Sequence, residues 1–465
     1  MVADPRPPPH AFTDPLAAVF ERAMVAALAQ LPPSPRLEYP YRLVSAVSGG
    51  PDSMALALLA QRFVATHGGT HRSIVVDHGI RPESDAEAAR VVTRLKACGI
   101  SARRVPVQTP APLTGIQEWA RSRRYEHLLA EARRDRACLL VGQHAGDQAE
   151  TVMMRLARGS GVAGLAGMRP VTMREGVPVI RPLLGAGRAA IIASCDRHAI
   201  ATEADPSNAD HRFERVRRRG EIAAMDAAGM EASSRLSRLA DAASAIDRAL
   251  LRQLGIAGMP DGLQAAGYLV LPFVALQMPP VILARLLASV IGLVAIPGYI
   301  PGRDALARLG MRLRDKKPST LGGARFNPLR EGWLVTAEIG RRSPRCQVRA
   351  GDEALFAGSW LITSPVDAVI RYLGEAGSGS RGGWQESRGW SGIPSLARRS
   401  LPVLETLDGT VLYPHLTTRE HPIARGADAQ AKCLRHKSVP DAPGRYGQQS
   451  FLRCRYNTFE GRHRP

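Results

Sequence analysis

The sequence has few cysteines and few aromatic residues. Its six cysteines include no C-x-x-C pair, so the chain carries neither a zinc nor an iron–sulfur signature. Their wide spacing is typical of reduced thiols in a cytosolic protein rather than of a disulfide framework. Phe, Trp and Tyr make up only 5% of the residues, so we expect a core built mostly from Leu, Val, Ile and Ala.

The chain also lacks a hydrophobic run long enough to span a bilayer. Residues 281–296 are the most apolar stretch, but they contain Arg285. They are also shorter than the roughly 20 residues that a span needs. The N-terminus is rich in proline and has no apolar signal core. We therefore expect a cytoplasmic protein with no membrane partner, and we expect residues 281–296 to form a buried helix.

Acidic residues are too few to balance the basic ones. The chain has 62 Lys and Arg residues against 42 Asp and Glu, which gives a formal net charge of +20. A nucleic acid suits this charge, because each phosphate that is neutralised releases counterions. An Arg-rich proteome would produce the same charge without such a partner, so the composition leaves both interpretations open.

Strand and helix signals alternate in the first half of the chain. The predicted strands cover residues 42–47, 74–77, 102–107, 138–142 and 179–180. Strands that alternate with helices form a mostly parallel, doubly wound α/β sheet that is covered on both faces. Such a sheet binds ligands beyond the carboxyl ends of its strands. Capping-box patterns predict that Ser84 and Thr114 open two of the helices.

The patterns divide the chain into four parts. Residues 1–40 are predicted to form a leader with one helix, and residues 41–219 the α/β domain. Residues 220–318 are Ala-rich at first, and we expect a helical middle domain there. Residues 319–465 are predicted to form a basic C-terminal region with short strands, whose tail has little apolar periodicity and is expected to be poorly ordered.

The first predicted strand ends in the hexapeptide SGGPDS, residues 48–53, at the start of a helix. Gly49 and Gly50 let backbone N–H groups approach a phosphate, and the helix N-terminus adds a positive dipole end. Asp52 suits the Mg²⁺ ion that accompanies phosphates. A Walker-type loop would contain Gly-Lys-Ser or Gly-Lys-Thr, so transfer of a γ-phosphate is not the expected chemistry. A capped helix after a glycine turn would explain only part of the hexapeptide.

Five further motifs follow in order along the chain. They are VDHGIR at 76–81, QHAGDQAET at 143–151, RLARGSG at 155–161, RPLL at 181–184 and DPSN at 205–208. Together with SGGPDS, they resemble the tRNA(Ile)-lysidine synthase family, which belongs to the PP-loop superfamily of N-type ATP pyrophosphatases. The resemblance covers about residues 40–220. It implies the PP-loop ATPase fold for that part of the chain.

Membership of this family implies a ligase that works in two steps. O2 of the wobble cytidine, in an isoleucine tRNA with a CAU anticodon, attacks the α-phosphate of ATP and releases pyrophosphate. The ε-amine of free L-lysine then attacks C2 of the adenylated base, which gives lysidine and releases AMP. The resemblance thus implies ATP and Mg²⁺ as cofactors and tRNA(Ile) and lysine as partners. A homodimer is one oligomeric state that the sequence permits.

Particular residues are expected to carry this chemistry. Asp52 is the expected metal ligand, and His144 or Asp147 the expected acceptor of the lysine proton. Arg158 is expected to neutralise phosphate charge. The expected ATP contacts are Ser48, Gly49, Gly50, Pro51, Asp52, Ser53, Val76, Asp77 and His78. The expected RNA contacts are Arg121, Arg124, Arg215 and Arg217.

Plainer interpretations of these residues stay open. His144 could be an ordinary loop histidine and Asp147 a helix N-cap. Arg121 and Arg124 could belong to a solvated basic face. Gly146 stands where the family usually has a first acidic residue, which leaves Asp147 as the acid immediately before Gln148.

Other functions also fit a PP-loop. A tRNA thiolase is the nearest alternative, but those sulfur-inserting enzymes typically use cysteine pairs, and the chain has no C-x-x-C. An amidating synthase is another, but no glutaminase segment is visible. A non-catalytic RNA-binding protein with a nucleotide fold is the alternative from a different class, and the intact hexapeptide argues against it.

Overall fold

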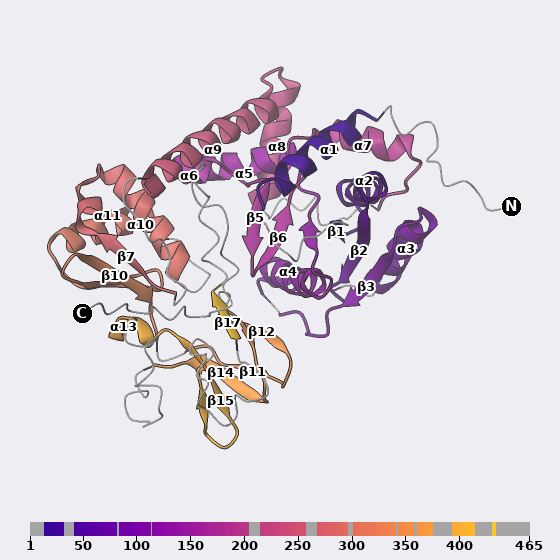
Figure 1. The fold of residues 1–465 in the computed structure, drawn as a ribbon. Coiled ribbons are helices and arrows are strands. Elements are labelled where there is room, and N and C mark those ends of the chain that lie inside the picture. The colour runs from indigo at the N-terminus through magenta and orange to yellow at the C-terminus, as the bar shows by residue number, and fades with distance from the viewer. Residues whose placement is uncertain are drawn as a thin grey trace, which may run out of the picture. The chain divides into compact units, whose positions relative to one another are not determined.

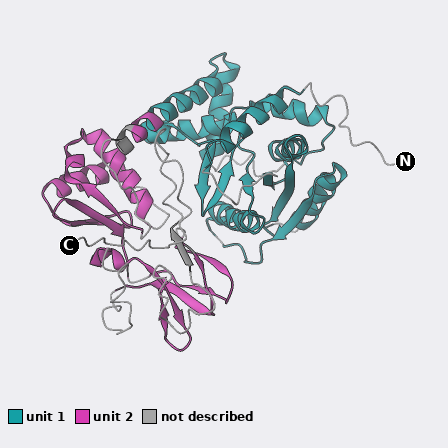
Figure 2. Cartoon of the chain, in the orientation of Figure 1, with its two compact units in different colours: residues 1–247 teal, residues 248–465 magenta. Residues whose placement is uncertain are grey.

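The structure is a computed structural model of the 465-residue chain. It describes residues 14–31, 41–80, 83–112, 114–203, 214–256, 267–295, 301–340, 343–357, 360–374, 393–413 and 430–433. The DPSN motif, Arg81 and most of the expected disordered tail therefore lie outside the described residues. The chain divides into two compact units, residues 1–247 and 248–465 (Figure 2). No helix in the described part is both long and apolar enough to cross a membrane.

A six-stranded sheet forms the centre of the N-terminal unit (Figure 1). Its strands are β1 (Tyr41–Val47), β2 (Gly69–Asp77), β3 (Ala102–Pro106), β4 (Cys138–Leu140), β5 (Val171–Arg174) and β6 (Val177–Ile180). They lie in the order β3-β2-β1-β4-β6-β5, and all neighbours run parallel except β5 and β6. This topology confirms the predicted doubly wound, mostly parallel fold.

The antiparallel edge strand β5 was not expected from the sequence. It joins β6 through the two-residue turn Glu175-Gly176, in which both residues have positive φ, +50° and +78°. Two positive φ values are typical of a type I′ hairpin turn, where glycine is favoured. The strand is only four residues long, and two of its side chains are exposed, so its hydrophobic pattern is weak.

Helices cover both faces of this sheet (Figure 1). They are α1 (Pro15–Leu28), α2 (Pro51–His67), α3 (Ser84–Ala97), α4 (Ile116–Arg134) and α7 (Arg188–Arg197). Successive side chains of a strand point to opposite faces. Leu43 of β1 therefore packs with residues of α1, α2 and α7, whereas its neighbour Val44 packs with residues of α4. Further helices of the described residues in this unit are α5 (Ala145–Ala157), α6 (Val162–Leu165) and α8 (Glu214–Ala227).

The two predicted capping boxes were wrong. Ser84 is already the first residue of α3, and the preceding Glu83 makes no side-chain cap. Thr114 lies two positions before Ile116, the first residue of α4, and Gly115 between them has φ +69°. A capping side chain must stand immediately before the first helical residue, in extended backbone. Neither pattern meets that condition.

The long helix α9 (Ala232–Ile256) contains the division between the units, so residues 220–247 belong to the N-terminal unit. The described strands of the C-terminal unit form three sheets, and their buried side chains belong to a hydrophobic cluster shared with its helices. Its helices are α10 (Pro280–Val294), α11 (Arg303–Arg314) and the short α13 (Ser395–Arg398), and η3 (Phe273–Gln277) is a 3-10 helix. The predicted buried helix at 281–296 is confirmed by α10, whose Leu287 and Val290 are fully buried.

The strands of the C-terminal unit run from β7 to β17. They are β7 (Leu269–Pro272), β8 (Ser319–Leu321), β9 (Ala324–Pro328), β10 (Gly332–Ala337), β11 (Cys346–Val348), β12 (Glu353–Phe356), β13 (Trp360–Thr363), β14 (Ala368–Tyr372), β15 (Pro402–Thr406), β16 (Val411–Leu412) and β17 (Gln430–Cys433). The helical middle domain expected at 220–318 contains α10 and α11, but β7 lies within it as well. This strand pairs with β10, some 60 residues later in the chain, a contact that local periodicity does not report.

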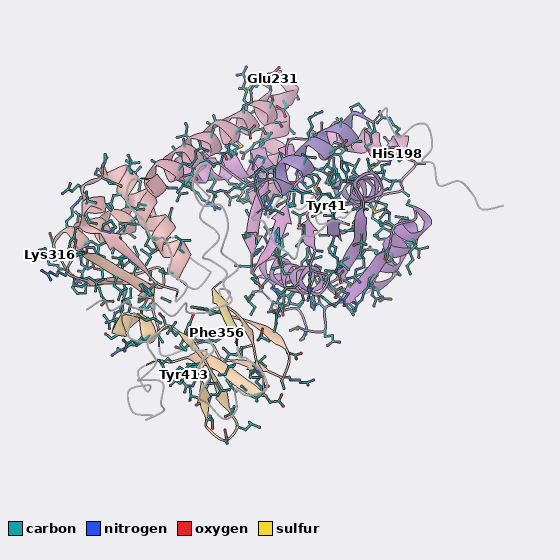
Figure 3. All side chains as sticks on the ribbon, viewed as in Figure 1. Tyr41, His198, Glu231, Lys316, Phe356 and Tyr413 are labelled. Atoms are coloured by element: carbon teal, nitrogen blue, oxygen red, sulfur yellow. The ribbon has the colours of Figure 1, made fainter. Side chains whose placement is uncertain are left out.

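A buried carboxylate ties the first helix to the sheet domain. Asp14 is the N-cap of α1 and accepts a hydrogen bond from the backbone N–H of Leu16 at 3.0 Å. It also accepts hydrogen bonds from Ser194 Oγ at 2.7 Å and Arg197 Nη1 at 2.9 Å, both on α7. His198, labelled in Figure 3, lies 3.2 Å from its other oxygen. One side chain thus both starts α1 and fastens it to α7.

Replacing Asp14 with Ala should lower the free energy of unfolding by about 2–3 kcal/mol, the usual cost of losing a cap and a buried charged acceptor. Burial acts to raise the pKa of Asp14, but its hydrogen bonds and the Arg197 charge lower it on balance. The stabilisation is therefore complete above about pH 4, the usual Asp pKa, and is lost as the pH falls through the lower folded-state pKa. Urea titrations from pH 7 to pH 3 measure this. Asp241→Ala, an exposed acid on α9, is the control, and equal losses for both variants would contradict the assignment.

Candidate active site

The predicted phosphate loop follows β1 and opens α2. Gly49 has φ +92°, a conformation that glycine adopts without strain. Ser53 Oγ accepts a hydrogen bond from Ser48 N at 3.1 Å and donates one to the carbonyl of Gly50 at 2.9 Å. Gly50 is the N-cap of α2 and forms no side-chain cap. The loop is therefore held by its own serines, with the positive end of the α2 dipole at its centre.

A second loop, between β4 and α5, touches the first. Gly142 lies in this second loop, two residues after the end of β4. A Cβ atom at Gly142 would lie 3.0 Å from the carbonyl oxygen of Asp52 and 3.3 Å from the backbone nitrogen of Ser53. Any side chain at Gly142 would push the two loops apart. Glycine at this position lets the N-termini of α2 and α5 converge at one edge of the sheet.

Two carboxylates and an imidazole meet where the loops converge. His144 Nε2 lies 3.7 Å from Asp52 Oδ1 and 3.7 Å from Asp147 Oδ2. The His144 residue is only 4% exposed. The structure therefore brings together the three residues, Asp52, His144 and Asp147, that were expected to act on the base and the phosphates.

The hydrogen bonds of His144 assign its ring nitrogens. It is the N-cap of α5, and its Nδ1 accepts the backbone N–H of Gly146 at 2.9 Å. Asp147 Oδ2 in turn accepts the backbone N–H of His144 at 3.1 Å, which completes a capping box. Because Nδ1 uses its lone pair on Gly146, the proton of the neutral ring is on Nε2 and points at the carboxylates. Nε2 of His144 thus faces both acids at 3.7 Å, and Asp147 occupies the third helical position rather than the N-cap.

The acid pair is suited to a divalent cation shared with phosphates. Asp52 Oδ1 is buried and has no hydrogen-bond partner. The described residues contain no group of three or more His, Cys, Asp or Glu side chains that could hold a metal by themselves. Mg²⁺ typically binds to one or two carboxylates and completes its shell with water and substrate phosphates. Asp52 is a carboxylate of this kind, and Asp147 lies 3.7 Å from the same imidazole nitrogen.

The VDH motif ends β2 at the same edge of the sheet. Asp77 Oδ1 accepts the backbone N–H of Gly79 at 3.0 Å, and Arg104 Nε lies 3.7 Å from its other oxygen. Burial, assisted by the charge of Arg124, lowers the pKa of His78 to about 4. His78 is therefore neutral near pH 7, with Nε2 accepting from Arg124 Nε at 3.5 Å. Asp77 holds the turn, and His78 is available for uncharged contacts.

The predicted arginines fall into two groups. Arg158 lies at the C-terminal end of α5, where its Nη2 is 2.6 Å from Glu214 Oε2. It is 11 residues from Asp147, about 16 Å along the helix axis at the usual rise of an α-helix. Arg215 Nε lies 3.4 Å from Glu150 Oε2 and its Nη2 donates to Thr151. Arg158 and Arg215 thus make ion pairs within the protein, Arg158 with Glu214 and Arg215 with Glu150.

Arg121 and Arg124 lie on the exposed side of α4, and Arg217 is exposed on α8. The guanidinium of Arg121 is 5.3 Å from the centre of the Tyr125 ring, and that of Arg174 is 4.0 Å from it. These contacts are cation–π pairs on a buried tyrosine. Arg121 and Arg174 therefore place two positive charges around the Tyr125 ring, on the face of the sheet that α4 covers.

Comparison with known proteins assigns a family to this geometry. A family model for the PP-loop domain matches residues 21–225. The tRNA(Ile)-lysidine synthase of Novosphingobium aromaticivorans is 38% identical over 317 residues, which cover 65% of this chain and 91% of the relative. Those of Ruegeria pomeroyi and Methylobacterium nodulans are 35% and 40% identical, over 73% and 61% of this chain and 81% and 86% of their own lengths. The chain belongs to the tRNA(Ile)-lysidine synthase family.

Glu150 and Arg219 also lie near this site, although the sequence analysis gave them no role in it. Glu150 is 2% exposed, and its Oε1 lies 2.6 Å from Arg219 Nε. Burial acts to lower the pKa of Arg219, but the hydrogen bond to Glu150 and the charges of Asp147 and Asp52 raise it on balance. Arg219 thus adds positive charge beside the acids. Only the motif position of Glu150 pointed to this pair in the sequence, because the partners are 69 positions apart in the chain.

A second unexpected contact joins two family motifs. Arg181 Nε donates to Gln143 Oε1 at 2.5 Å, and its Nη1 donates to the carbonyl of Arg169 and to Thr172 Oγ1. Gln143 is the residue before His144. Arg181 therefore braces the α5 loop from the β5–β6 hairpin, an element that the sequence analysis missed.

Gly146 has a steric reason to be glycine in this family member. A Cβ atom at Gly146 would lie 2.6 Å from His144 Cε1 and 3.1 Å from its Nδ1. Such contacts are too short for the imidazole to stay in place. The acid that the family usually carries here is therefore incompatible with this position of His144.

Gly146→Ala should displace His144 and lower the rate of product formation about tenfold to a hundredfold, since a shift of about 1 Å at a reacting group has costs of that order. Single-turnover assays measure the rate. Gly187→Ala is the matched control, because Gly187 also stands at a helix start but has open space for a Cβ. The double variant His144→Ala/Gly146→Ala should be no slower than His144→Ala alone. Full additivity of the two effects would contradict the coupling.

Proposed function

We propose that this protein ligates free lysine to C2 of the wobble cytidine of tRNA(Ile), through adenylation of the base by ATP. The observation that carries this proposal is the meeting of Asp52, His144 and Asp147 at the phosphate loop. Adenylation requires charge neutralisation on phosphates, and lysine attack requires a proton acceptor close by. Residues that can meet both requirements lie together at this loop. Family membership supplies the reaction that links them.

The phosphate loop and Asp52 serve the first step. The backbone N–H groups of Gly49, Gly50 and Asp52 and the N-terminus of α2 are available to the triphosphate. Asp52 would hold Mg²⁺, which would supply positive charge to the phosphates when bound. Arg219 adds a fixed positive charge beside the two acids. Val76, Asp77 and His78 line the neighbouring strand end, where we place the nucleoside part of ATP.

The second step needs a neutral lysine amine. Lysine in water has a pKa near 10.4, so almost all of it is protonated at pH 7. Asp147 is the acceptor that we favour. His144, the other expected acceptor, has its Nδ1 engaged by Gly146, and its Nε2 lies 3.7 Å from both acids, so we assign it to positioning them. This assigns proton acceptance to a carboxylate and a positioning role to the imidazole.

The exposed arginines provide contacts for the RNA. Arg121, Arg124 and Arg217 have guanidinium groups at the surface of the N-terminal unit. Arg158 and Arg215 are ion-paired with Glu214 and Glu150, so we assign them to fastening α8 to α5. Phosphate contacts of this kind fix the position of a nucleic acid without reading its sequence. We also propose that the reaction takes place in the cytoplasm. A homodimer is one oligomeric state that can be tested.

The alternative function of a sulfur-inserting enzyme is not supported by Cys195, the cysteine that contacts the phosphate loop. Cys195 Sγ lies 3.5 Å from the carbonyl of Pro51, but it is buried. Burial raises the pKa of its thiol to about 11. A thiol with so high a pKa is a poor nucleophile, since the thiolate is the reactive form.

The reaction is tested with purified protein, ATP, lysine and a tRNA(Ile) transcript with a CAU anticodon. Mass spectrometry of the digested RNA should find lysidine, and pyrophosphate release should depend on the tRNA. Asp52→Asn should abolish both while the melting temperature stays within a few degrees, because the loop keeps its shape but loses the charge that holds the cation. Normal pyrophosphate release by folded Asp52→Asn would disprove the role of this carboxylate.

Asp147→Asn should separate the two steps. The amide keeps an oxygen to cap α5 but cannot accept a proton, so adenylated tRNA should accumulate and lysidine formation should fall about 100-fold or more. Asp147→Ala removes the cap as well and should lower both yields further. Quenched reactions with labelled ATP and tRNA count AMP-linked RNA against lysidine. If Asp147→Asn forms neither species, this residue acts at or before adenylation instead.

A further inference from the structure

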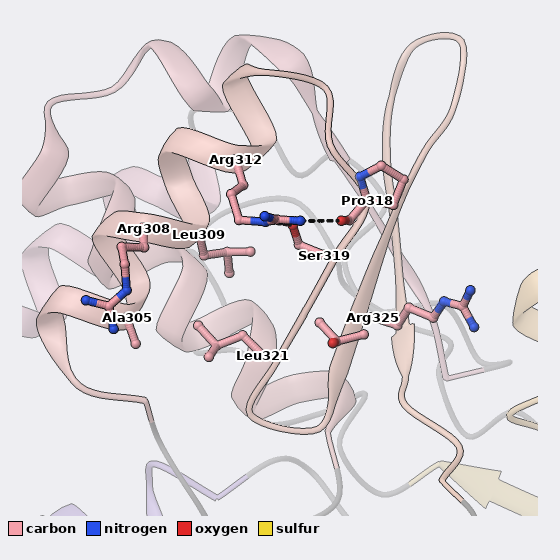
Figure 4. A pocket seen from close by; sticks show the side chains of 9 residues that line it. Ala305, Arg308, Leu309, Arg312, Pro318, Ser319, Leu321 and Arg325 are labelled. Atoms are coloured by element: carbon pink, nitrogen blue, oxygen red, sulfur yellow. Dashed lines mark hydrogen bonds between the residues drawn. The ribbon is translucent and has the colours of Figure 1, made fainter.

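The surface pocket in Figure 4 has no converging charges. It lies in the C-terminal unit, between α11 and the hairpin of β8 and β9, and its volume is about 510 Å³. Arg308 and Arg325 extend away from it on opposite sides, and Arg312 is occupied by Ser319 and by the carbonyl of Pro318. Charged side chains do converge beside the phosphate loop of the N-terminal unit, and they come from outside the family motifs.

Glu203, in the segment after α7, lies against the phosphate loop. Its backbone N–H donates to the carbonyl of Gly49 at 2.9 Å. Its side chain also lies beside this glycine, because a Cβ atom placed on Gly49 would be only 3.3 Å from Glu203 Cγ. The same Cβ atom would lie 2.7 Å from Cγ2 of Val91, a buried residue of α3. Gly49 is therefore enclosed between Glu203 and α3, with no room for a side chain.

Two arginines of α3 hold the carboxylate of Glu203. Arg94 Nη1 lies 2.7 Å from Glu203 Oε1, and Arg90 Nε lies 3.4 Å from the same oxygen. The two arginines stand four positions apart and therefore on one face of the helix. Their ion pairs fasten residue 203 to α3, next to the phosphate loop. The side-chain pairing thus keeps the backbone N–H of Glu203 at the carbonyl of Gly49.

The hydrogen bond to Gly49 sets the direction of the next N–H group in the loop. In a trans peptide, the carbonyl oxygen and the following N–H point to opposite sides. The carbonyl of Gly49 is directed at Glu203, so the N–H of Gly50 is directed away from it. Neither glycine has a Cβ atom, so rotation of the peptide between them meets little steric resistance. Such a rotation would replace the N–H with a carbonyl oxygen, which repels a phosphate.

We propose that Glu203 is a positioning residue of the phosphate loop, which fixes the Gly49–Gly50 peptide with its N–H available to the phosphates of ATP. Arg90 and Arg94 act through Glu203 and do not themselves bind phosphate. This inference rests on the proposed function, which assigns ATP to this loop. The two ion pairs are partly exposed, so they contribute little to the stability of the fold. Their loss should therefore weaken ATP binding while the protein stays folded.

Calorimetry with ATP and Mg²⁺ on the full-length protein tests this role. Glu203→Ala should raise Kd for ATP about threefold to tenfold, the range expected when one or two partly exposed ion pairs are lost. KM for ATP should rise with it, whereas KM for tRNA, and kcat at saturating ATP, should stay close to the wild-type values. The inhibition constant of adenosine, which has no phosphate, should not change. Glu203→Asp keeps the charge and should recover part of the lost affinity.

Combined variants separate positioning from direct contact with phosphate. R90A/R94A removes both partners of Glu203 and should weaken ATP binding about as much as Glu203→Ala does. The triple variant R90A/R94A/E203A should be no weaker than either, because all three residues act as one unit. If the arginines bound phosphate themselves, Glu203→Ala would free them and leave ATP binding unchanged or tighter, whereas R90A/R94A would weaken it. That result would overturn the proposal.

Two single variants test the hydrogen bond and the charge separately. Glu203→Pro removes the backbone donor itself and should weaken ATP binding more than Glu203→Ala does. Unchanged ATP binding by folded Glu203→Pro would contradict the role of the hydrogen bond. Asp196→Ala removes one negative charge from an exposed position on α7 and should leave Kd for ATP unchanged. An equal rise in this control would show that net charge, and not the contact with the loop, is responsible.

Lysidine formation by the wild-type protein tests the proposed function by itself. If the wild type makes no lysidine but the variants show the expected losses of ATP affinity, the proposed function fails and the role of Glu203 stands. If the wild type makes lysidine and every variant binds ATP normally, the role of Glu203 is disproved and the proposed function stands.

Discussion

The close approach of two backbone loops is the constraint on which the site depends. Gly142 can lie against the carbonyl of Asp52 only because it has no side chain. Strand β1 lies between β2 and β4, which is where the winding of a doubly wound sheet reverses and leaves a crevice. Two helices, α2 and α5, begin at this crevice with their positive dipole ends facing it. The phosphate loop and the acid pair follow from that single arrangement.

Electrostatic balance at this crevice is shared between the protein and its substrates. Asp52 and Asp147 place negative charge at helix N-termini, and the Nε2–H of His144 faces both. Arg219, paired with buried Glu150, contributes the opposite charge from α8. Asp52 Oδ1 still has no hydrogen-bond donor. A buried acceptor without a partner is costly, and a cation that arrives with the triphosphate would relieve that cost.

The same His144 arrangement shows how a family site can tolerate a changed residue. Gly146 lacks the usual acid, yet it frees the space in which the imidazole lies. The capping hydrogen bonds then hold the ring against the start of α5. A missing carboxylate and a fixed histidine are therefore two consequences of one substitution. The carboxylate is lost at Gly146, and the imidazole of His144 is held in place instead.

The sequence by itself determined the parallel sheet, the phosphate loop and the family, because alternating apolar runs and contiguous motifs are local signals. It also identified Asp52, His144 and Asp147, which stand next to strand ends. It missed β5 and β7, which are recognised by their pairing with other strands. It also misplaced the starts of two helices, because capping depends on the backbone conformation of a single residue. Only the tertiary structure decided that Arg158 pairs with Glu214, that Arg215 and Arg219 both pair with Glu150, and that Nδ1 of His144 accepts from Gly146. The physical reason is that a side chain's partner, and hence its charge and its proton, is set by residues that folding brings from elsewhere in the chain.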